Sequence, residues 1–414
     1  MITYEEARAQ ILARIGVMPT TTVSLPRLLN YVTASPLVAP LDSPSFDNSA
    51  VDGYGVRVQD LALAAEGSPA KLLLKGTIRA GDAPPSQRLG ANSAFKILTG
   101  ACVPQSVEAV VMREYCQEVS GEVFISTTAA PGENIRRRGG EFLRGTEVMD
   151  AGRLLTPSLV GLVANLGYRT LEVHRKPRAS VVTTGNELTK PGRELMPGMI
   201  YDSNSYAMAS ALRTSGIEDV QMLHAREDFA HTKAVLARAL AVSDVVISTG
   251  GVSVGEFDHV KAAMEALGVK THLWRIAIKP GKPVYFGVLE GKRGRRSKYV
   301  FGLPGNPVSA LVTYHQFVLP SLRKLSGLAS YADEIWLPAV LTKAIRKKPG
   351  RLEFVRGNLQ MRDGTLQVEP TSGQDSHMLG GLASADALIY FDQHAPEFPA
   401  GAQVKVTPLR WSLN

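Results

Sequence analysis

The sequence predicts a multi-domain α/β plus β protein whose largest part is an α/β domain with a mostly parallel sheet. The chain has 414 residues, which exceeds the limit of about 250–300 residues for one hydrophobic core. Within residues 177–328, short β-branched or apolar runs alternate with helical patterns, as in a parallel sheet covered on both faces. On either side of this stretch, short runs separated by Gly and Pro indicate β-rich regions.

The first residues carry the signature of a helix N-terminus. Thr3 followed by Glu6 predicts a capping box, in which the two residues satisfy each other's backbone N–H groups. Apolar residues then recur at helical spacing: Ala7, Ile11, Leu12 and Ile15. We expect this helix to pack on a larger domain. The segment 31–54 is rich in Pro, Ser and Asp, which favours an extended or turning chain.

A small β-domain is expected between residues 56 and 124. Its strands are predicted at 71–75, 95–98 and 109–114. A helix is predicted within 151–171, because Pro157 stands at a first helical position and Gly167 just beyond the end.

The α/β region shows four predicted strands alternating with four predicted helices. The strands are expected at 179–183, 220–224, 244–248 and 299–301, and the helices at 205–215, 232–242, 258–267 and 307–325. The basic segment 292–298 is interpreted as the solvated tip of a hairpin between two strands. From residue 335 onward, short runs and turns such as 362–365 indicate a β-barrel or sandwich.

Composition favours a folded protein of the cytoplasm, while the net charge alone identifies no partner. Apolar residues make up 44% and charged residues 20% of the chain, as in ordinary folded domains. The two cysteines argue against a disulfide framework or a zinc site. No signal peptide and no apolar run long enough for a membrane span is evident. The net charge of +8 comes from dispersed residues without a nucleic-acid-binding signature, so small anionic ligands explain it equally well.

Three predicted strands end in turns that contain glycine: 183–187, 248–253 and 302–307. In an open parallel sheet, ligands bind outside the carboxyl ends of the strands. Glycines there let backbone N–H groups approach a phosphate closely. Such glycines can also serve only to turn the chain, but three of them in one domain favour a ligand site. None of the turns has the spacing of a dinucleotide-binding or P-loop motif.

Acidic residues on these turns predict a divalent cation. Glu187, Asp202, Glu256 and Asp258 would repel a phosphate ligand unless Mg²⁺ lay between them. Asp202 could instead cap the helix that follows it, and Glu256 and Asp258 could be no more than acidic residues of a first helical turn. Lys279 and Lys282 lie in a stretch stiffened by two prolines, which suits the binding of an anion.

The densest polar motif is the segment 45–55, which contains Asp47, Asn48, Ser49 and Asp52. These side chains are more than a turn requires. They either serve a site or satisfy the backbone of a long irregular loop, and the residues alone leave both readings open.

Taken in order along the chain, these motifs resemble those of the molybdopterin molybdenumtransferase (MoeA) family. The matching segments are 46–54, 97–101, 136–141, 184–188, 249–258, 278–283 and 302–307. Gly350-Arg351 and Ser376-His377 stand where the C-terminal domain of the family supplies similar residues. Val51 replaces the usual Met, and Glu141 the more common Asp. The resemblance extends to the E domain of gephyrin, which binds receptor tails, so a scaffold is one alternative function. A molybdopterin adenylyltransferase is the other, although that activity requires neither 46–54 nor a C-terminal β-domain.

The resemblance implies a domain organisation. Residues 1–45 and 140–176 would form an elongated N-terminal dimerisation segment, and 46–139 an inserted β-rich domain. Residues 177–328 would form a MogA-like α/β domain, and 329–414 a C-terminal β-barrel. A homodimer with a shared active site is expected, and the molybdopterin adenylyltransferase is a candidate partner.

The resemblance also implies the reaction and the site. The substrates would be adenylylated molybdopterin and molybdate, with Mg²⁺ as cofactor and AMP as leaving group. The sequence does not distinguish a preference for molybdenum from one for tungsten. Catalytic roles would fall on Asp52, Glu187, Asp258, Lys279 and Lys282. Mg²⁺ would be bound by Glu187, Asp228 and Asp258. The substrate-binding residues would be Thr99, Glu141, Thr249, Gly250, Gly251, Ser253, Pro304, Pro307, Arg351 and Ser376. Of these, Asp52, Thr99 and Glu141 would reach the site from the partner chain. Lys279, Lys282, Arg351 and Ser376 would hold anionic groups, and the prolines would shape a rigid wall.

Overall fold

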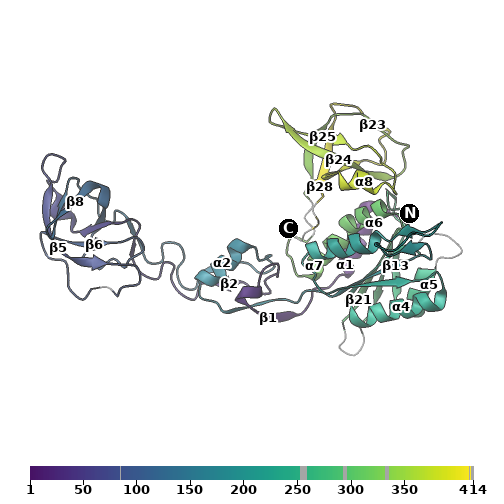
Figure 1. Ribbon diagram of the computed structural model, residues 1–414, viewed down its shortest axis with the longest axis horizontal. Coiled ribbons are helices and arrows are strands. Elements are labelled where there is room, and N and C mark those ends of the chain that lie inside the picture. The colour runs from purple at the N-terminus through teal and green to yellow at the C-terminus, as the bar shows by residue number, and fades with distance from the viewer. Residues whose placement is uncertain (84, 252–258, 292–295, 332–334, 410, 412–414) are drawn as a thin grey trace. The chain divides into compact units, whose positions relative to one another are not determined.

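The computed structural model describes residues 1–414 except 84, 252–258, 292–295, 332–334, 410 and 412–414 (Figure 1). The chain divides into two compact units. Unit 1 comprises Met1–Ser35, Ala151–Gly161 and Arg169–Asn414, and unit 2 comprises Pro36–Asp150 and Leu162–Tyr168. Within the described part of the chain, no helix is both long and apolar enough to cross a membrane.

The centre of unit 1 is a six-stranded sheet in the order β16-β13-β17-β21-β20-β18. The strands are β13 (Ala179–Thr184), β16 (Val220–Ala225), β17 (Val245–Thr249), β18 (Lys270–Trp274), β20 (Tyr285–Leu289) and β21 (Lys298–Leu303). The first four in spatial order are parallel, and β20 and β18 are antiparallel to their neighbours. The mostly parallel sheet is therefore confirmed, as is the hairpin β20–β21 around the basic segment, although 292–295 lie outside the described residues.

Helices cover both faces of this sheet (Figure 1). They are α1 (Tyr4–Arg14), α3 (Asn204–Thr214), α4 (Phe229–Val242), α5 (His259–Ala266), α6 (Pro307–Thr313) and α7 (Leu319–Leu325). Successive strand residues point to opposite faces. Ile247 accordingly joins the core shared with α1, α3, α6 and α7, whereas its neighbour Val246 joins the core shared with α4 and α5. Helix α1 begins at the predicted capping box of Thr3 and Glu6.

The predicted helix 307–325 is interrupted in the structure. A π-helical turn, η4 (Tyr314–Val318), separates α6 from α7. Pro320 stands in the first turn of α7. Proline has no N–H group to donate to the preceding turn, so a regular α-helix cannot run through this position without losing a hydrogen bond.

The C-terminal part of unit 1 is a closed barrel rather than a sandwich. Its strands are β22 (Leu337–Leu341), β24 (Leu352–Arg362), β25 (Thr365–Pro370), β26 (Ala387–Phe391) and β28 (Gln403–Pro408). They follow the order β24-β25-β22-β28-β26, and the pairing of β26 with β24 closes the ring. The short strand β19 (Ile278–Lys279) pairs in parallel with the start of β24. The ring is accompanied by β23 (Ile345–Arg346), β27 (Glu397–Phe398) and helix α8 (Leu379–Ala383).

Unit 2 is built on a six-stranded sheet in the order β7-β4-β6-β5-β9-β8. The strands are β4 (Gly53–Val56), β5 (Ala70–Ile78), β6 (Ser93–Ile97), β7 (Ala109–Met112), β8 (Cys116–Val119) and β9 (Glu122–Ile125). The predicted β-rich domain is therefore confirmed, with an apolar core that includes Leu72, Ala94 and Val123.

Short paired strands make up most of the rest of the N-terminal half. In unit 2, β2 (Leu37–Val38) pairs with β11 (Glu147–Met149), and β3 (Asn48–Ser49) pairs with β10 (Ile135–Arg136). In unit 1, β1 (Thr20–Ser24) pairs with β12 (Thr170–His174). The helix predicted from Pro157 is present as α2 (Pro157–Asn165).

Candidate functional site

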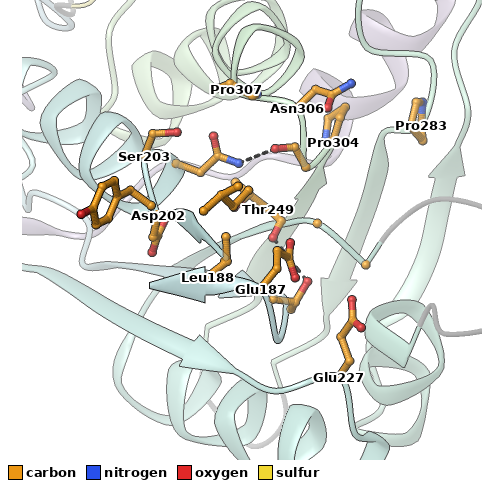
Figure 2. Close-up of a pocket in the computed structure, with 17 residues that line it drawn as sticks. Glu187, Leu188, Asp202, Ser203, Glu227, Thr249, Pro283, Pro304, Asn306 and Pro307 are labelled. Carbon is orange, nitrogen blue, oxygen red and sulfur yellow. Dashed lines mark hydrogen bonds between the residues drawn. The ribbon is translucent and has the colours of Figure 1, made fainter. Parts of the chain in front are cut away.

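A cleft of about 460 Å³ lies at the carboxyl ends of the four parallel strands of unit 1. Its lining combines the strand-end turns with β14 (Leu188–Thr189) and β15 (Ile200–Tyr201). The lining residues are Thr184, Glu187, Leu188, Ile200, Tyr201, Asp202, Ser203, Asn204, Glu227, Thr249, Gly250, Gly251, Pro283, Pro304, Gly305, Asn306 and Pro307. Figure 2 shows these side chains around the cleft. All three glycine-containing turns predicted to bind a ligand contribute to it.

The turn after β13 presents Glu187 to the cleft. Gly185 has a φ of +148°, and a Cβ at this position would lie 2.5 Å from a carboxylate oxygen of Glu187. A side chain at this position would therefore crowd the Glu187 carboxylate where it folds back over the turn. The side chain of the intervening Asn186 accepts a hydrogen bond of 3.2 Å from the backbone N–H of Glu227. This bond ties the turn after β13 to the turn after β16.

The turn after β17 forms the floor of the cleft with Thr249, Gly250 and Gly251. Both glycines have positive φ, and a Cβ on Gly250 would lie 3.0 Å from the carbonyl oxygen of Thr184. Two neighbouring strand ends therefore approach each other to a distance that only glycine permits. Ser253 and Asp258, which the sequence places in the same site, lie outside the described residues.

The turn after β21 forms the opposite side with Pro304, Asn306 and Pro307 (Figure 2). Pro304 is buried, and Pro307 is the first residue of α6. The side-chain amide of Asn204 donates a 2.6 Å hydrogen bond to the carbonyl of Gly305 and so ties this turn to the start of α3. The two prolines thus belong to a turn that is anchored by Asn204 of α3 and that continues directly into α6.

The described part of the cleft is acidic. Glu187, Asp202 and Glu227 line it, and none of the described lining residues is Lys or Arg. Asp202 makes a bond at the start of α3 and also lines the cleft, and its ligand role stays a prediction. Its carboxylate accepts a 3.0 Å hydrogen bond from the backbone N–H of Ser205 in the first turn of α3 and a 3.1 Å bond from the Thr183 hydroxyl, and it also faces the cleft.

Asp228, expected to bind Mg²⁺, is placed differently from Glu187. It is the N-cap of α4, where its carboxylate accepts a 2.7 Å hydrogen bond from the backbone N–H of His231. The cleft is lined instead by its neighbour Glu227. The capping bond fixes the turn that presents Glu227. A metal-binding role for Asp228 stays a prediction.

The donor set of the cleft suits Mg²⁺. Among the described residues, no three His, Cys, Asp or Glu side chains gather closely enough to enclose a metal ion. Mg²⁺ does not require such a cage, because it is commonly held by one or two carboxylates, water and substrate phosphates. Glu187, Asp202 and Glu227 offer hard oxygen ligands of this kind in the lining of the cleft.

A cluster of cations lies at the junction of β19 with the barrel. Lys279 forms a 2.8 Å ion pair with the buried Glu353, because the parallel register of β19 and β24 places the two residues side by side. Lys347 donates a 2.5 Å hydrogen bond to the carbonyl of Arg351 and lies over the ring of Phe391. Partial burial lowers the pKa of Lys347; the charges of Glu353 and Asp392 oppose this shift, and those of Lys279 and Arg351 add a smaller lowering. Lys279 and Arg351, predicted from distant motifs to bind anions, are therefore brought together.

Lys282 and Ser376 connect this cluster to the cleft. Lys282 is exposed and directly precedes Pro283, which lines the cleft. Between the two lysines, Gly281 has a φ of +110°, and a Cβ there would lie 2.3 Å from the side chain of Thr313 in α6. Ser376, from the barrel, accepts a 2.7 Å hydrogen bond from the side chain of the lining residue Asn306.

In unit 2, Asp52 and Thr99 are brought together, although 46 residues separate them in the chain. The backbone N–H and the hydroxyl of Thr99 both donate to one carboxylate oxygen of Asp52 at 2.7 Å. The backbone bond and then the hydroxyl bond lower the pKa of Asp52, with a smaller effect from Arg113. Glu141 accepts a 2.9 Å hydrogen bond from the Ser43 hydroxyl.

Other members of the dense motif have structural roles. Ser49 donates to the carbonyl of Val51, and the Tyr54 hydroxyl donates to Glu118 at 2.7 Å. A Cβ on Gly53 would lie 2.0 Å from the carbonyl oxygen of Val111, so only glycine fits beside β7. Asp47 is held by Arg137 and by the backbone N–H of Arg138. These residues satisfy the loop, whereas Asp52 keeps an exposed, ionised carboxylate.

Sequence reasoning missed Glu227, Glu353, Asn204 and Asn306. Glu227 follows the predicted strand 220–224, so the strand-end rule that found Glu187 could also have found it. The role of Glu353 depends on the pairing of β19 with β24, and those of the two asparagines on contacts about 70 to 100 residues away along the chain. No local pattern signals these contacts.

Comparisons with known proteins match this arrangement over the whole chain. Family models match the MoeA N-terminal region (domain I and II) at residues 2–167, a probable molybdopterin binding domain at 180–324, and the MoeA C-terminal region (domain IV) at 338–409. The chain is 35% identical to the molybdopterin molybdenumtransferase of Haemophilus influenzae, with 100% of both sequences covered. It is 36% identical to molybdopterin molybdenumtransferase 2 of Mycobacterium tuberculosis, with 95% of each covered. Its fold is similar to the crystal structure of the molybdopterin biosynthesis MoeA protein of Pyrococcus horikoshii, with a TM-score of 0.80, 26% identity, and coverage of 99% of this chain and 100% of that one.

Proposed function

The chain belongs to the molybdopterin molybdenumtransferase family, and we propose that it inserts molybdenum from molybdate into adenylylated molybdopterin with Mg²⁺-dependent release of AMP. The observation that carries the proposal is the junction of two oppositely charged groups in unit 1. An acidic cleft at four strand ends adjoins a cluster of cations, and Pro283 and the Asn306–Ser376 hydrogen bond link the two. An acidic cleft suits a metal-bound phosphate, and a cationic cluster suits an oxyanion.

The acidic cleft is the proposed site of the phosphate linkage. Carboxylates alone would repel a phosphate, so the ligand and Glu187, Asp202 and Glu227 need a cation between them. Mg²⁺, when bound, would neutralise this charge and polarise the phosphate oxygens. The backbone of Gly250 and Gly251 offers close approach to the ligand. We also propose, by the family resemblance, that Asp258 belongs to this set, and Asp258→Ala is expected to abolish metal insertion without unfolding the protein.

The cationic cluster is the proposed site of molybdate. Lys279, Lys282 and Arg351 supply positive charge, and the hydroxyl of Ser376 can donate its proton to an oxyanion while its oxygen accepts the bond from Asn306. Glu353 holds the ammonium group of Lys279 in place and limits the net charge of the cluster. Molybdate and tungstate share the charge and shape that such a site recognises, so selectivity between them requires a direct competition measurement.

A homodimer with a shared site is the second element of the proposal. Asp52, Thr99 and Glu141 belong to unit 2, and by the family resemblance they would complete the active site of the partner protomer. Mixing an Asp52→Ala variant with a Glu187→Ala variant tests this directly. In a two-fold symmetric dimer, random exchange should recover about a quarter of the wild-type activity. No recovery, despite proven subunit exchange, would place both residues in the site of one protomer.

The deciding experiment measures AMP release from adenylylated molybdopterin with Mg²⁺, in the presence and absence of molybdate. Molybdate-dependent release, with metal appearing on the pterin, would support the transferase. Absence of release from a folded protein that still binds the pterin would contradict it and would favour a scaffold. The adenylyltransferase that must supply this substrate is the proposed partner upstream. Transient association with it would appear as a lower KM for the adenylylated pterin when the two enzymes are coupled.

A further inference from the structure

The barrel contains a fully buried arginine that the proposed reaction does not use. Arg356 lies on β24 and has no exposed surface. Burying a guanidinium group is costly unless its donors find partners. Its Nη2 donates to the carbonyls of Gly373 at 2.5 Å and Asp375 at 3.3 Å. Among the described residues, its Nε and Nη1 find no hydrogen-bond partner. The side-chain hydrogen bonds that Arg356 makes with the described residues both lead to one segment, 371–376.

The same segment is also bound to the backbone of Arg356. The Arg356 N–H donates to the side chain of Gln374 at 3.0 Å, and the Gln374 amide donates back to the Arg356 carbonyl at 2.9 Å. The backbone N–H of Thr371 donates to that carbonyl as well, at 2.9 Å. Gln374 also donates to the carbonyl of Thr371. A segment without regular structure is thus fixed to one residue by several hydrogen bonds, as a single unit.

The segment ends at the edge of the cleft. The Ser376 carbonyl accepts a 3.2 Å hydrogen bond from the backbone N–H of Val308, and the Ser376 hydroxyl accepts the bond from Asn306. Val308 is the second residue of α6, where a backbone N–H has no partner within the helix. Ser376 therefore satisfies the start of α6 and the asparagine that lines the cleft at the same time.

We propose that Arg356 is a positioning residue, which holds the segment 371–376 so that Ser376 stays at the edge of the cleft. The alternation of side chains between the two faces of β24 supports this role of Arg356. Phe354 packs into the core shared with α1 and α6, and Val355 into the interior of the barrel. Arg356 shares the face of Phe354, so its charge lies between barrel and α/β domain. An effect of Arg356 on molybdate binding rests on the proposed function. The mechanical link from Arg356 through the segment 371–376 to Ser376 does not.

Amide hydrogen exchange at Val308 tests the mechanical link without any activity assay. Gln374→Ala and Arg356→Met should each speed exchange of the Val308 N–H about tenfold or more, because its bond to Ser376 would loosen. Arg356→Lys retains a cationic donor for the two carbonyls and should restore part of the protection. Val406→Ala is the matched control, since it removes buried volume from the apolar core of the barrel, a cluster that includes no residue of 371–376. Unchanged Val308 exchange in a folded Arg356→Met variant, or an equal effect of Val406→Ala, would overturn the proposal.

Steady-state kinetics test the link to the anion. Gln374→Ala should raise the KM for molybdate about tenfold, a change that corresponds to the loss of roughly one hydrogen bond. The KM for adenylylated molybdopterin should change by less than about twofold. An unchanged KM for molybdate, in a variant whose Val308 has lost protection, would overturn the connection to the anion site. If the wild type releases no AMP, the proposed function fails instead, and the exchange result still decides the role of Arg356.

Discussion

One carboxylate oxygen of Asp52 accepts both the backbone N–H and the hydroxyl of Thr99, each at 2.7 Å. The pair joins the residue before β4 to the turn after β6, two strands that are neighbours in the sheet of unit 2. Because both bonds reach the same oxygen, the second oxygen of the carboxylate makes no bond with Thr99. The relationship orients an exposed anion without burying it.

Thr99→Val should raise the pKa of Asp52 toward its ordinary value of 3.8, because the variant loses the hydroxyl donor and keeps the backbone one. Since the folded pKa is lowered, the stabilisation from these bonds is present above pH 3.8 and is lost as the pH falls through the folded pKa. Titration of the carboxyl resonance by NMR measures the shift. Thr127→Val, a matched change elsewhere in unit 2, should leave the pKa unchanged, and equal values in the two variants would contradict the assignment.

Gly185→Ala should reduce activity about tenfold or more while the protein stays folded. The new Cβ would lie 2.5 Å from the carboxylate of Glu187, and the flexible end of that side chain is the part that can move away. Gly192→Ala is the control, because Gly192 also has a positive φ but a Cβ there meets nothing within 4 Å. It should lose about 1–2 kcal/mol of stability from backbone strain alone and keep its kcat. Equal activity losses in both variants would show that strain, rather than displacement of Glu187, is responsible.

Tyr54→Phe should lower the free energy of unfolding of unit 2 by about 1 kcal/mol and leave kcat unchanged. Tyr54 is only 5% exposed, and its hydroxyl donates to Glu118, which also pairs with Lys96. Burial and then the bond to Glu118 raise the pKa of Tyr54, so the hydroxyl remains a donor throughout the physiological range. Denaturant unfolding and AMP release, measured on the same sample, separate the two effects. A large loss of kcat at unchanged stability would instead assign Tyr54 to the substrate.

Lys279→Met should raise the KM for molybdate about tenfold, whereas Lys270→Met, at an exposed position of β18, should not change it. The wild-type KM should also rise with ionic strength, because exposed cations attract an anion less strongly when salt screens them. Lys279 is half exposed, but its partner Glu353 is buried. Lys279→Met therefore also leaves a buried carboxylate without its ion-pair partner, so the free energy of unfolding is measured together with the KM. A KM for molybdate that is insensitive to both Lys279→Met and salt would exclude this cluster as the oxyanion site.

Much of the fold could be predicted from local patterns. The alternation of Val245, Val246 and Ile247 between two cores follows from the two-residue period of a strand, and the capping box of Thr3 and Glu6 needs only neighbours three residues apart. The interruption of the helix 307–325 could not be read from its apolar spacing, because the spacing continues through Pro320. The domain limits and the dimer remain predictions.

The sequence by itself determined many of the elements, the alternation of strands and helices in the α/β region, and the strand-end turns that carry Glu187, Thr249 and Pro304. These features depend on residues close together in the chain, where spacing and glycine or proline placement restrict the backbone. Only the tertiary structure decided which side chains meet. It placed Lys279 against Glu353, joined Asn306 to Ser376, and put Glu227 rather than Asp228 at the cleft. Such contacts depend on strand register and on packing between distant segments, and no local pattern records either.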